Sequence, residues 1–140
     1  MKWRTSKLDE VKAQEKGALV SGPFGSNIGS RFFVTEGVPV IRGNNLSMGQ
    51  EEFIDEGFVF ITEGKARQLK NCNARSDDII FTAAGTLGQV GLIPKNSRFR
   101  NYIISNKQIR LRLDTSQAFP HFVYYFLSSP DMRAFCCKSE

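Results

Sequence analysis

Residues 78–93 of this chain read DIIFTAAGTLGQVGLI, and this stretch decides the fold class. Residues 79–81 are apolar on both faces, which is typical of a β-strand buried on both sides. The string GTLG at 85–88 predicts a tight turn, and residues 89–93 then return as a second strand. We therefore expect a buried β-hairpin in the second half of the chain.

Residues 102–113 follow this hairpin and predict the longest strand of the protein. From Ser105 onward apolar and polar residues alternate, as they do along a strand with one exposed face. The two sets are Ile109, Leu111 and Leu113 on one side, and Gln108, Arg110 and Arg112 on the other. We expect the first set to face the core and the second set to carry positive charge into solvent.

Short elements joined by loops are expected in the first half: a helix over 7–16, a loop over 21–27, strands over 38–42 and 58–61, and a helix over 63–69. Gly17 should end the first of these helices, and Thr62 should cap the second. Pro39 cannot donate a backbone hydrogen bond, so its strand should be an edge strand or one that starts late.

The C-terminal part predicts two helices. Five apolar residues fall at helical spacing in the first of them: Phe119, Phe122, Val123, Phe126 and Leu127. Pro120 suits the first turn of this helix, and Pro130 starts the next helix by the same device. The resulting fold class is α+β, with a β-rich body and a C-terminal helical pair.

Length and composition indicate one soluble domain over 1–140, since about 150 residues per domain is the usual prior. Twelve of the aromatic residues are Phe, against three Tyr and one Trp, so a Phe-rich core is expected. The longest apolar run, residues 122–127, is far shorter than the roughly 20 residues that a membrane span needs. Three cysteines, with Cys136 and Cys137 adjacent, suit reduced thiols in the cytoplasm better than a disulfide framework.

The net charge of +5 indicates an acidic partner, because the excess is concentrated in one stretch. Six basic residues and no acidic one lie in it: Lys95, Arg98, Arg100, Lys107, Arg110 and Arg112. Such a stretch suits a polyanion such as nucleic acid, although a solvated pair of basic strands has the same composition.

Motifs for chemistry are largely missing. The glycines at 85–88 join strand to strand, so no helix dipole supports phosphate binding there. His121 and the three cysteines lack the usual spacing of zinc ligands. A metal-dependent nuclease could be assembled from Asp55, Glu63 and Lys65, but Glu63 and Lys65 open a helix and do not share a strand. We expect no catalysis, no metal and no cofactor.

Six strings, taken together and in order, resemble a target recognition domain of the DNA-specificity (S) subunit of type I restriction–modification systems. They are WRTSKLDEV from Trp3, GPFGSN at 22–27, GVPVIRGNNL at 37–46, DIIF with GTLGQVG at 78–91, SNKQ at 105–108, and FVYYFLSS at 122–129. The resemblance covers nearly the whole chain, from Trp3 to about Arg133.

This resemblance implies a β-helix-like recognition domain with a C-terminal helical hairpin. It also implies a non-catalytic role, in which the domain reads one half of a bipartite site in double-stranded DNA. Partner methylase and restriction subunits would then act, the methylase on an adenine flipped out of the duplex. A whole subunit carries two such domains and long spacer helices. This chain has one copy and no spacer, so we expect a fragment, a truncated gene product or a half-subunit that has lost its spacer. We expect a homodimer only where a spacer helix is present.

The expected DNA contacts divide into base readout and phosphate contact. Arg42, Asn44 and Asn45 lie where a strand meets a turn, and Gln89 follows the glycine turn, so these four are candidates for reading bases. Asn44 and Asn45 could instead be turn residues that adopt positive φ. Lys107, Arg110 and Arg112 are expected to contact phosphates. The alternatives are a module that docks only on the methylase partner, and a degenerate metal-dependent nuclease.

Overall fold

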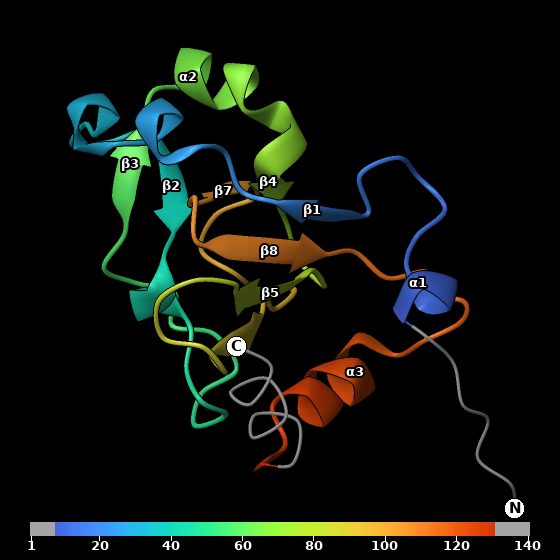
Figure 1. Cartoon of the computed structure of the whole chain (residues 1–140). Helices are drawn as coiled ribbons and strands as arrows, with labels where there is room; N and C mark the ends of the chain where they lie inside the picture. The colour runs from blue at the N-terminus through green and yellow to red at the C-terminus, as the bar shows by residue number, and fades with distance from the viewer. Residues whose placement is uncertain (1–7, 131–140) are drawn as a thin grey trace, which may run out of the picture.

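The computed structural model describes residues 8–130 and shows a mixed α+β fold with two four-stranded sheets (Figure 1). The first sheet has the order β1-β8-β5-β6, formed by β1 (Leu19–Ser21), β8 (Gln108–Leu111), β5 (Ile79–Thr82) and β6 (Val90–Leu92). The second has the order β3-β2-β7-β4, formed by β3 (Val59–Ile61), β2 (Val38–Ile41), β7 (Tyr102–Ile104) and β4 (Asn73–Ala74). The chain passes repeatedly between the two sheets, so neither forms from one continuous segment.

Three α-helices accompany the sheets in the described part of the chain: α1 (Leu8–Val11), α2 (Glu63–Gln68) and α3 (Pro120–Leu127). Four short 3₁₀ helices lie in the connections: η1 (Gly25–Asn27), η2 (Ser30–Phe32), η3 (Gly43–Asn45) and η4 (Lys70–Cys72). In Figure 1 the second sheet lies above the first sheet, and α3 lies below it. No helix within residues 8–130 is long and apolar enough to cross a membrane.

The expected hairpin is confirmed. β5 and β6 pair antiparallel in the register Ile79↔Leu92, Ile80↔Gly91 and Phe81↔Val90. The side chains of Ile79 and Ile80 are both fully buried although they point to opposite faces. One face packs toward the second sheet and the other toward α3, which explains why the sequence of this strand is apolar on both sides.

The single long strand expected over 102–113 is wrong. The chain turns at 105–107, so β7 belongs to the second sheet and β8 to the first. The expected alternation along β8 does hold, since Leu111 packs in the cluster below the sheet and Arg110 lies across from Ile80 on the other face. The expectation that the polar face of β8 meets solvent is wrong, because the second sheet covers this face. Gln108 and Arg110 on it are 2% and 3% exposed.

Of three smaller expectations, one is wrong, one holds in part and one is confirmed. The first helix ends at Val11, because Lys12 already bridges to Leu113 in a β-type pairing, and it does not continue to 16. The strand that holds Pro39 is an interior strand. The pairing of this strand with β7 starts only at Val40, so Pro39, which has no backbone N–H, lies outside that pairing. The Thr62 cap is confirmed, since its hydroxyl accepts a hydrogen bond from the backbone N–H of Lys65 at 3.1 Å.

The helix α3 forms where expected, with Pro120 in its first turn, but a different side of it is buried. Val123 and Tyr124 face the first sheet, and the Tyr124 hydroxyl donates to the carbonyl of Glu51 at 3.1 Å. The aromatic stripe points outward instead: the exposed fractions are 73% for Phe119, 61% for Phe122, 64% for Tyr125 and 53% for Phe126. The second expected helix lies outside the described residues.

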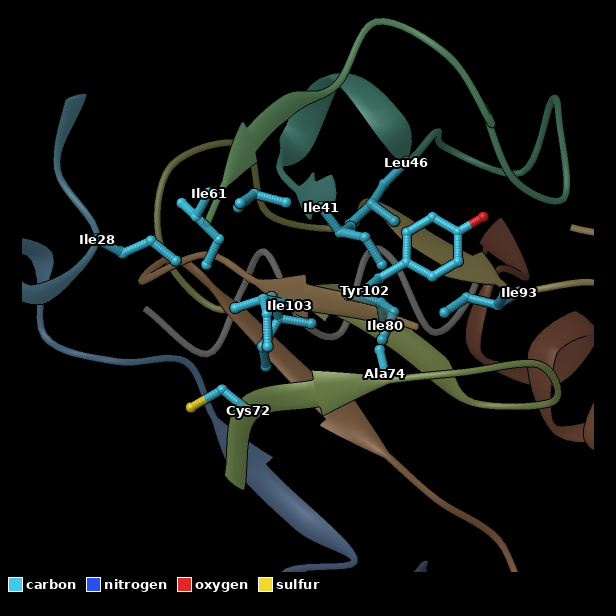
Figure 2. Close-up of a cluster of buried hydrophobic side chains, with 12 residues drawn as sticks. Ile28, Ile41, Leu46, Ile61, Cys72, Ala74, Ile80, Ile93, Tyr102 and Ile103 are labelled. Atoms are coloured by element: carbon cyan, nitrogen blue, oxygen red, sulfur yellow. The ribbon is translucent and has the colours of Figure 1, made fainter. Parts of the chain in front are cut away.

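The core is built from isoleucine, so the expected Phe-rich core is wrong. Figure 2 shows the main cluster, where side chains from both sheets meet; Ile41, Ile61 and Ile80 in it are fully buried. No described Phe is fully buried. β-Branched side chains fill the space between the sheets, and partly buried Phe rings pack against this cluster.

Tyr102 joins this core to an aromatic group. Its ring lies edge-on to Phe53 and Phe99, with centroid separations of 5.7 Å and 5.8 Å. Its hydroxyl donates to Oδ1 of Asp55 at 2.7 Å, and the other oxygen of Asp55 accepts from the backbone N–H of Arg98. Burial, with the adjacent carboxylate of Asp55, raises the pKa of Tyr102 to about 12.

We expect Tyr102 to make stability fall with rising pH above 10. The unfolded phenol loses its proton near pH 10 and the folded one near pH 12. The folded state therefore binds one more proton in that window, and its contribution is complete below pH 10 and lost as pH rises to 12. Between pH 10 and 12, the free energy of unfolding measured in urea should fall more in wild type than in Tyr102→Phe, by on the order of 2 kcal/mol.

Tyr125→Phe, which removes an exposed phenol from α3, is the matched control for this measurement. If wild type and Tyr102→Phe lose stability in parallel between pH 10 and 12, the hydrogen bond to Asp55 has no part in alkaline unfolding.

Candidate nucleic-acid interface

Four segments that are far apart in the sequence meet at the end of the first sheet where β8 begins: residues 22–27, Gly43–Asn45, 83–88 and 105–107. We call this surface the loop edge. Each segment contains part of one of the strings that carry the family resemblance. Contacts between backbones and small residues hold the four segments together.

The loop at 22–27 packs against 105–107 through two glycines. The backbone N–H of Gly22 donates to the carbonyl of Gln108 at 2.9 Å. A Cβ at Gly22 would lie 1.8 Å from the carbonyl oxygen of Ser105, and one at Gly25 would lie 3.2 Å from Nδ2 of Asn106. Gly22 is therefore required by the close approach of two backbones, which no side chain could enter.

The turn of the β5–β6 hairpin docks on the same loop from the other side. The backbone N–H of Ala83 donates to the carbonyl of Lys107 at 2.8 Å. Gly85 and Gly88 have φ values of +95° and +92°, a region that glycine adopts without strain. The loop at 105–107 thus lies between the hairpin turn and residues 22–27.

A directed chain of side-chain hydrogen bonds continues across the first sheet to η3. The Ser105 hydroxyl donates to Oε1 of Gln108, and Nε2 of Gln108 donates to the hydroxyl of Thr82 at 3.5 Å. Thr82 donates to Oε1 of Gln89 at 3.1 Å, and Nε2 of Gln89 donates to the carbonyl of Gly43 at 3.2 Å. Each of these four side chains donates one hydrogen bond to the next acceptor, so the polar chain connects the loop at 105–107 to η3.

Asn45 supports the η3 turn from inside, which corrects its expected role as a base-reading residue. Its side chain is 0% exposed; Oδ1 accepts from the backbone N–H of Arg42, and Nδ2 donates to the carbonyls of Ile54 and Glu56. The alternative of a positive φ is also wrong, because Asp77 is the non-glycine residue with positive φ in the described chain. Gln89 is likewise occupied, by Thr82 and Gly43.

Two of the expected contact residues are exposed at the loop edge or beside it, and a third is half-buried. Lys107 is exposed, and so is Asn44, whose Nδ2 donates to the carbonyl of Gly57 at 3.0 Å. Within residues 8–130, Oδ1 of Asn44 accepts no hydrogen bond from the protein. Arg42 is half-buried, and its Nε is buried without a hydrogen-bond partner in the described chain.

Arg110 does not reach the surface, so its expected contact with phosphate is wrong. Its guanidinium lies between the sheets and donates to the carbonyls of Asn71, Asn73 and Gly17 and to Oδ1 of Asn73. Burial, with the nearby charge of Arg112, lowers the pKa of Arg110. These bonds join β8 to β4 and to the turn before β1, which is a structural role.

Arg112 is also taken up by the fold, which corrects its expected contact with phosphate. Nε and Nη2 donate to the two carboxylate oxygens of Asp78 at 2.9 Å and 2.7 Å, a bidentate pair whose carboxylate is 2% exposed. This hydrogen bond raises the pKa of Arg112. Glu15 lies 3.7 Å away as a second acidic neighbour.

The basic stretch 95–112 therefore does not form one positive face. Arg110 is buried, Arg112 is half-buried and bound to Asp78, and the side chain of Arg98 donates to the carbonyl of Asp55 at 3.0 Å. Lys107 is the member of the stretch that lies at the loop edge.

Sequence reasoning missed a different pair of cations. The guanidinium carbon of Arg31 and Nζ of Lys65 lie 4.5 Å and 3.8 Å from the centre of the Phe32 ring. Arg31 also donates to the carbonyl of Ser26, within the loop edge. No local pattern could reveal this pair, because Arg31 and Lys65 are brought together only by the fold.

Phe24 was missed as well, although it left a signal in the sequence. Its side chain is 83% exposed at the loop edge. An apolar residue placed between Pro23 and Gly25, in a loop with no helical or strand period, has no core to face.

The nuclease alternative receives no support from the geometry. Asp55 accepts hydrogen bonds from Tyr102 and Arg98, and Lys65 lies over Phe32. Within residues 8–130, no group of three or more His, Cys, Asp or Glu side chains is arranged to hold a metal ion.

A scan against protein-family models finds no match for this chain, and a search of curated proteins finds no similar sequence.

We expect Arg112→Ala to destabilise the fold by about 3–5 kcal/mol, because it leaves the buried carboxylate of Asp78 without its cation. Lys107→Ala, which removes an exposed cation nearby, should change stability by less than about 0.5 kcal/mol. The midpoints of urea unfolding measure both. Equal midpoints for the two variants would mean that the ion pair of Arg112 with Asp78 does not stabilise the fold.

Proposed function

We propose that this chain is a DNA-recognition domain that reads one half of a bipartite site in double-stranded DNA, as in the specificity subunits of type I restriction–modification systems. Methylase and restriction subunits bound to it carry out the chemistry, and the chain itself is not an enzyme. The proposal includes a β-helix-like domain, a C-terminal helical hairpin, action in the cytoplasm, and a homodimer where a spacer helix is present.

The observation that carries this function is the convergence of the resembling strings at the loop edge. Glycine-rich turns are common one at a time, but residues 22–27, η3, 83–88 and 105–107 lie together although they are spread over more than half of the chain. Loops placed side by side on a sheet are a common location for binding residues. Four of the six strings therefore contribute to one surface.

The side chains exposed at the loop edge match the chemistry of a DNA duplex. Lys107 provides a positive charge for phosphate, and Asn44 and Asn106 provide amides of the kind that pair with the edge of adenine. Behind them, the polar chain from Ser105 to Gly43 holds the loops in one arrangement. A rigid surface loses less conformational entropy on binding, which favours both affinity and selectivity.

A second candidate, docking on a methylase partner alone, is favoured by the outward aromatic side of α3. Phe122 and Phe126 are more than half exposed, and contiguous apolar surface of this kind is typical of protein interaction sites. The two candidates separate experimentally. Phe122→Ser should abolish capture of a purified type I methylase subunit if docking is the function, and it should leave duplex binding unchanged.

Selection of bound sequences from random duplex DNA tests the proposed function directly. Binding should be at best roughly micromolar and should weaken with salt, because half of a bipartite reader makes few contacts. Enrichment of a short motif supports the function. An affinity that is the same at low and at physiological salt contradicts a surface that contacts phosphates.

We expect Lys107→Ala and Asn44→Ala to affect DNA binding differently. Lys107→Ala should weaken binding to all sequences alike and lower the slope of log affinity against log salt by about one. Asn44→Ala should change the preference at one base position, by about 1–3 kcal/mol. Fluorescence anisotropy with the selected duplex and its single-base variants measures both effects. Sequence-selective loss in Lys107→Ala, with no change in Asn44→Ala, would reverse these assignments.

A further inference from the structure

Phe24 is the most exposed of the large hydrophobic side chains in the described chain. Its exposed fraction is 83%, above the 73% of Phe119 on α3. Burying a phenyl ring is worth about 1.5–3 kcal/mol relative to leaving it in water, so an isolated ring on a loop forgoes that stabilisation. A ring kept in this position gains the most from a ligand that covers it.

The loop holds Phe24 outward and gives it little freedom to fold back. The carbonyl of Phe24 accepts from the backbone N–H of Asn27 at 2.8 Å, and Ile28, next along the chain, is buried in the main core. On the other side, Gly22 is fixed against the carbonyl of Ser105 at a distance that excludes any side chain. The ring is therefore presented on a braced segment, because both ends of the segment are anchored.

The surroundings of the ring are polar and positive. Asn106 lies beside Gly25, and Lys107 follows it in the same loop. On the other side Arg31 binds the carbonyl of Ser26, two residues from Phe24. Within the described chain, neither Lys107 nor Arg31 has an acidic side chain within ion-pair distance. An apolar ring next to unpaired cations fits a partner that offers flat apolar faces beside negative charge.

We propose that Phe24 is an apolar wedge that stacks on a base pair of bound duplex DNA, which rests on the DNA-reading function proposed above. Proteins that bind DNA insert Phe and other apolar side chains at base steps, where they partly unstack the duplex. Lys107 and Arg31 contact phosphates next to that step. Base stacking does not depend on hydrogen-bond readout, so Phe24 contributes affinity and duplex distortion, and Asn44 contributes sequence preference.

The test compares Phe24→Ala and Phe24→Trp with wild type on the selected duplex, carrying a fluorescent aminopurine at each adenine position in turn. Phe24→Ala should bind about 5- to 100-fold more weakly. It should also lose the aminopurine fluorescence change that unstacking produces at one position in the wild-type complex. Phe24→Trp should restore both. Phe119→Ala, which removes another exposed ring, is the matched control and should bind as wild type does.

The outcomes separate the wedge from the DNA-reading function. Wild-type selection that enriches a motif, with Phe24→Ala equal to wild type in affinity and fluorescence, overturns the wedge and leaves the function in place. Equal losses in Phe24→Ala and Phe119→Ala would also overturn it, since any exposed ring would then have the same effect. Wild type that binds no duplex overturns both. All four proteins should unfold at similar urea concentrations, which shows that a loss is not a folding defect.

Discussion

The buried guanidinium of Arg110 is the constraint on which the arrangement of the two sheets depends. A charge removed from water costs several kcal/mol unless its donors are satisfied. Here carbonyls accept hydrogen bonds from Nη1 and Nη2 of Arg110, and Nε is buried without a hydrogen-bond partner in the described chain. Those carbonyls come from Asn71 and Asn73 beside the second sheet and from Gly17 before β1. Because Arg110 itself belongs to the first sheet, its hydrogen bonds require both sheets and the N-terminal turn to be in place together.

The same face of β8 shows how the core and the loop edge are connected. Gln108 lies two residues before Arg110 on that face. It accepts a hydrogen bond from Ser105 and donates one to Thr82, and the same chain of hydrogen bonds continues to η3. The interior of this protein is therefore apolar around Ile80 and polar along β8. Apolar packing holds the layers together, and the polar side chains fix how they are aligned.

This organisation explains why the exposed groups lie where they do. Residues that the fold needs, such as Asn45, turn inward at the loop edge, and their neighbours Asn44 and Lys107 are left facing solvent. The glycines allow close contact between loops, as Gly22 does with Ser105. The surface is therefore formed mainly by packed backbone, and few side chains project from it. A surface of that kind can exchange its exposed residues without changing its framework, which suits a recognition role.

The sequence by itself determined the local structure: the hairpin around Ile79 and Ile80, the Thr62 cap and the alternation along β8, because these depend on periodicity and turn chemistry within a few residues. It also predicted exposed side chains at Arg42, Asn44 and Asn45, and of these three only Asn44 is exposed. Only the tertiary structure decided which face of β8 meets water, since a second sheet assembled from distant segments covers the polar side. Burial of Arg110 has the same cause: a side chain's environment is set by what packs on it, and periodicity does not carry that information.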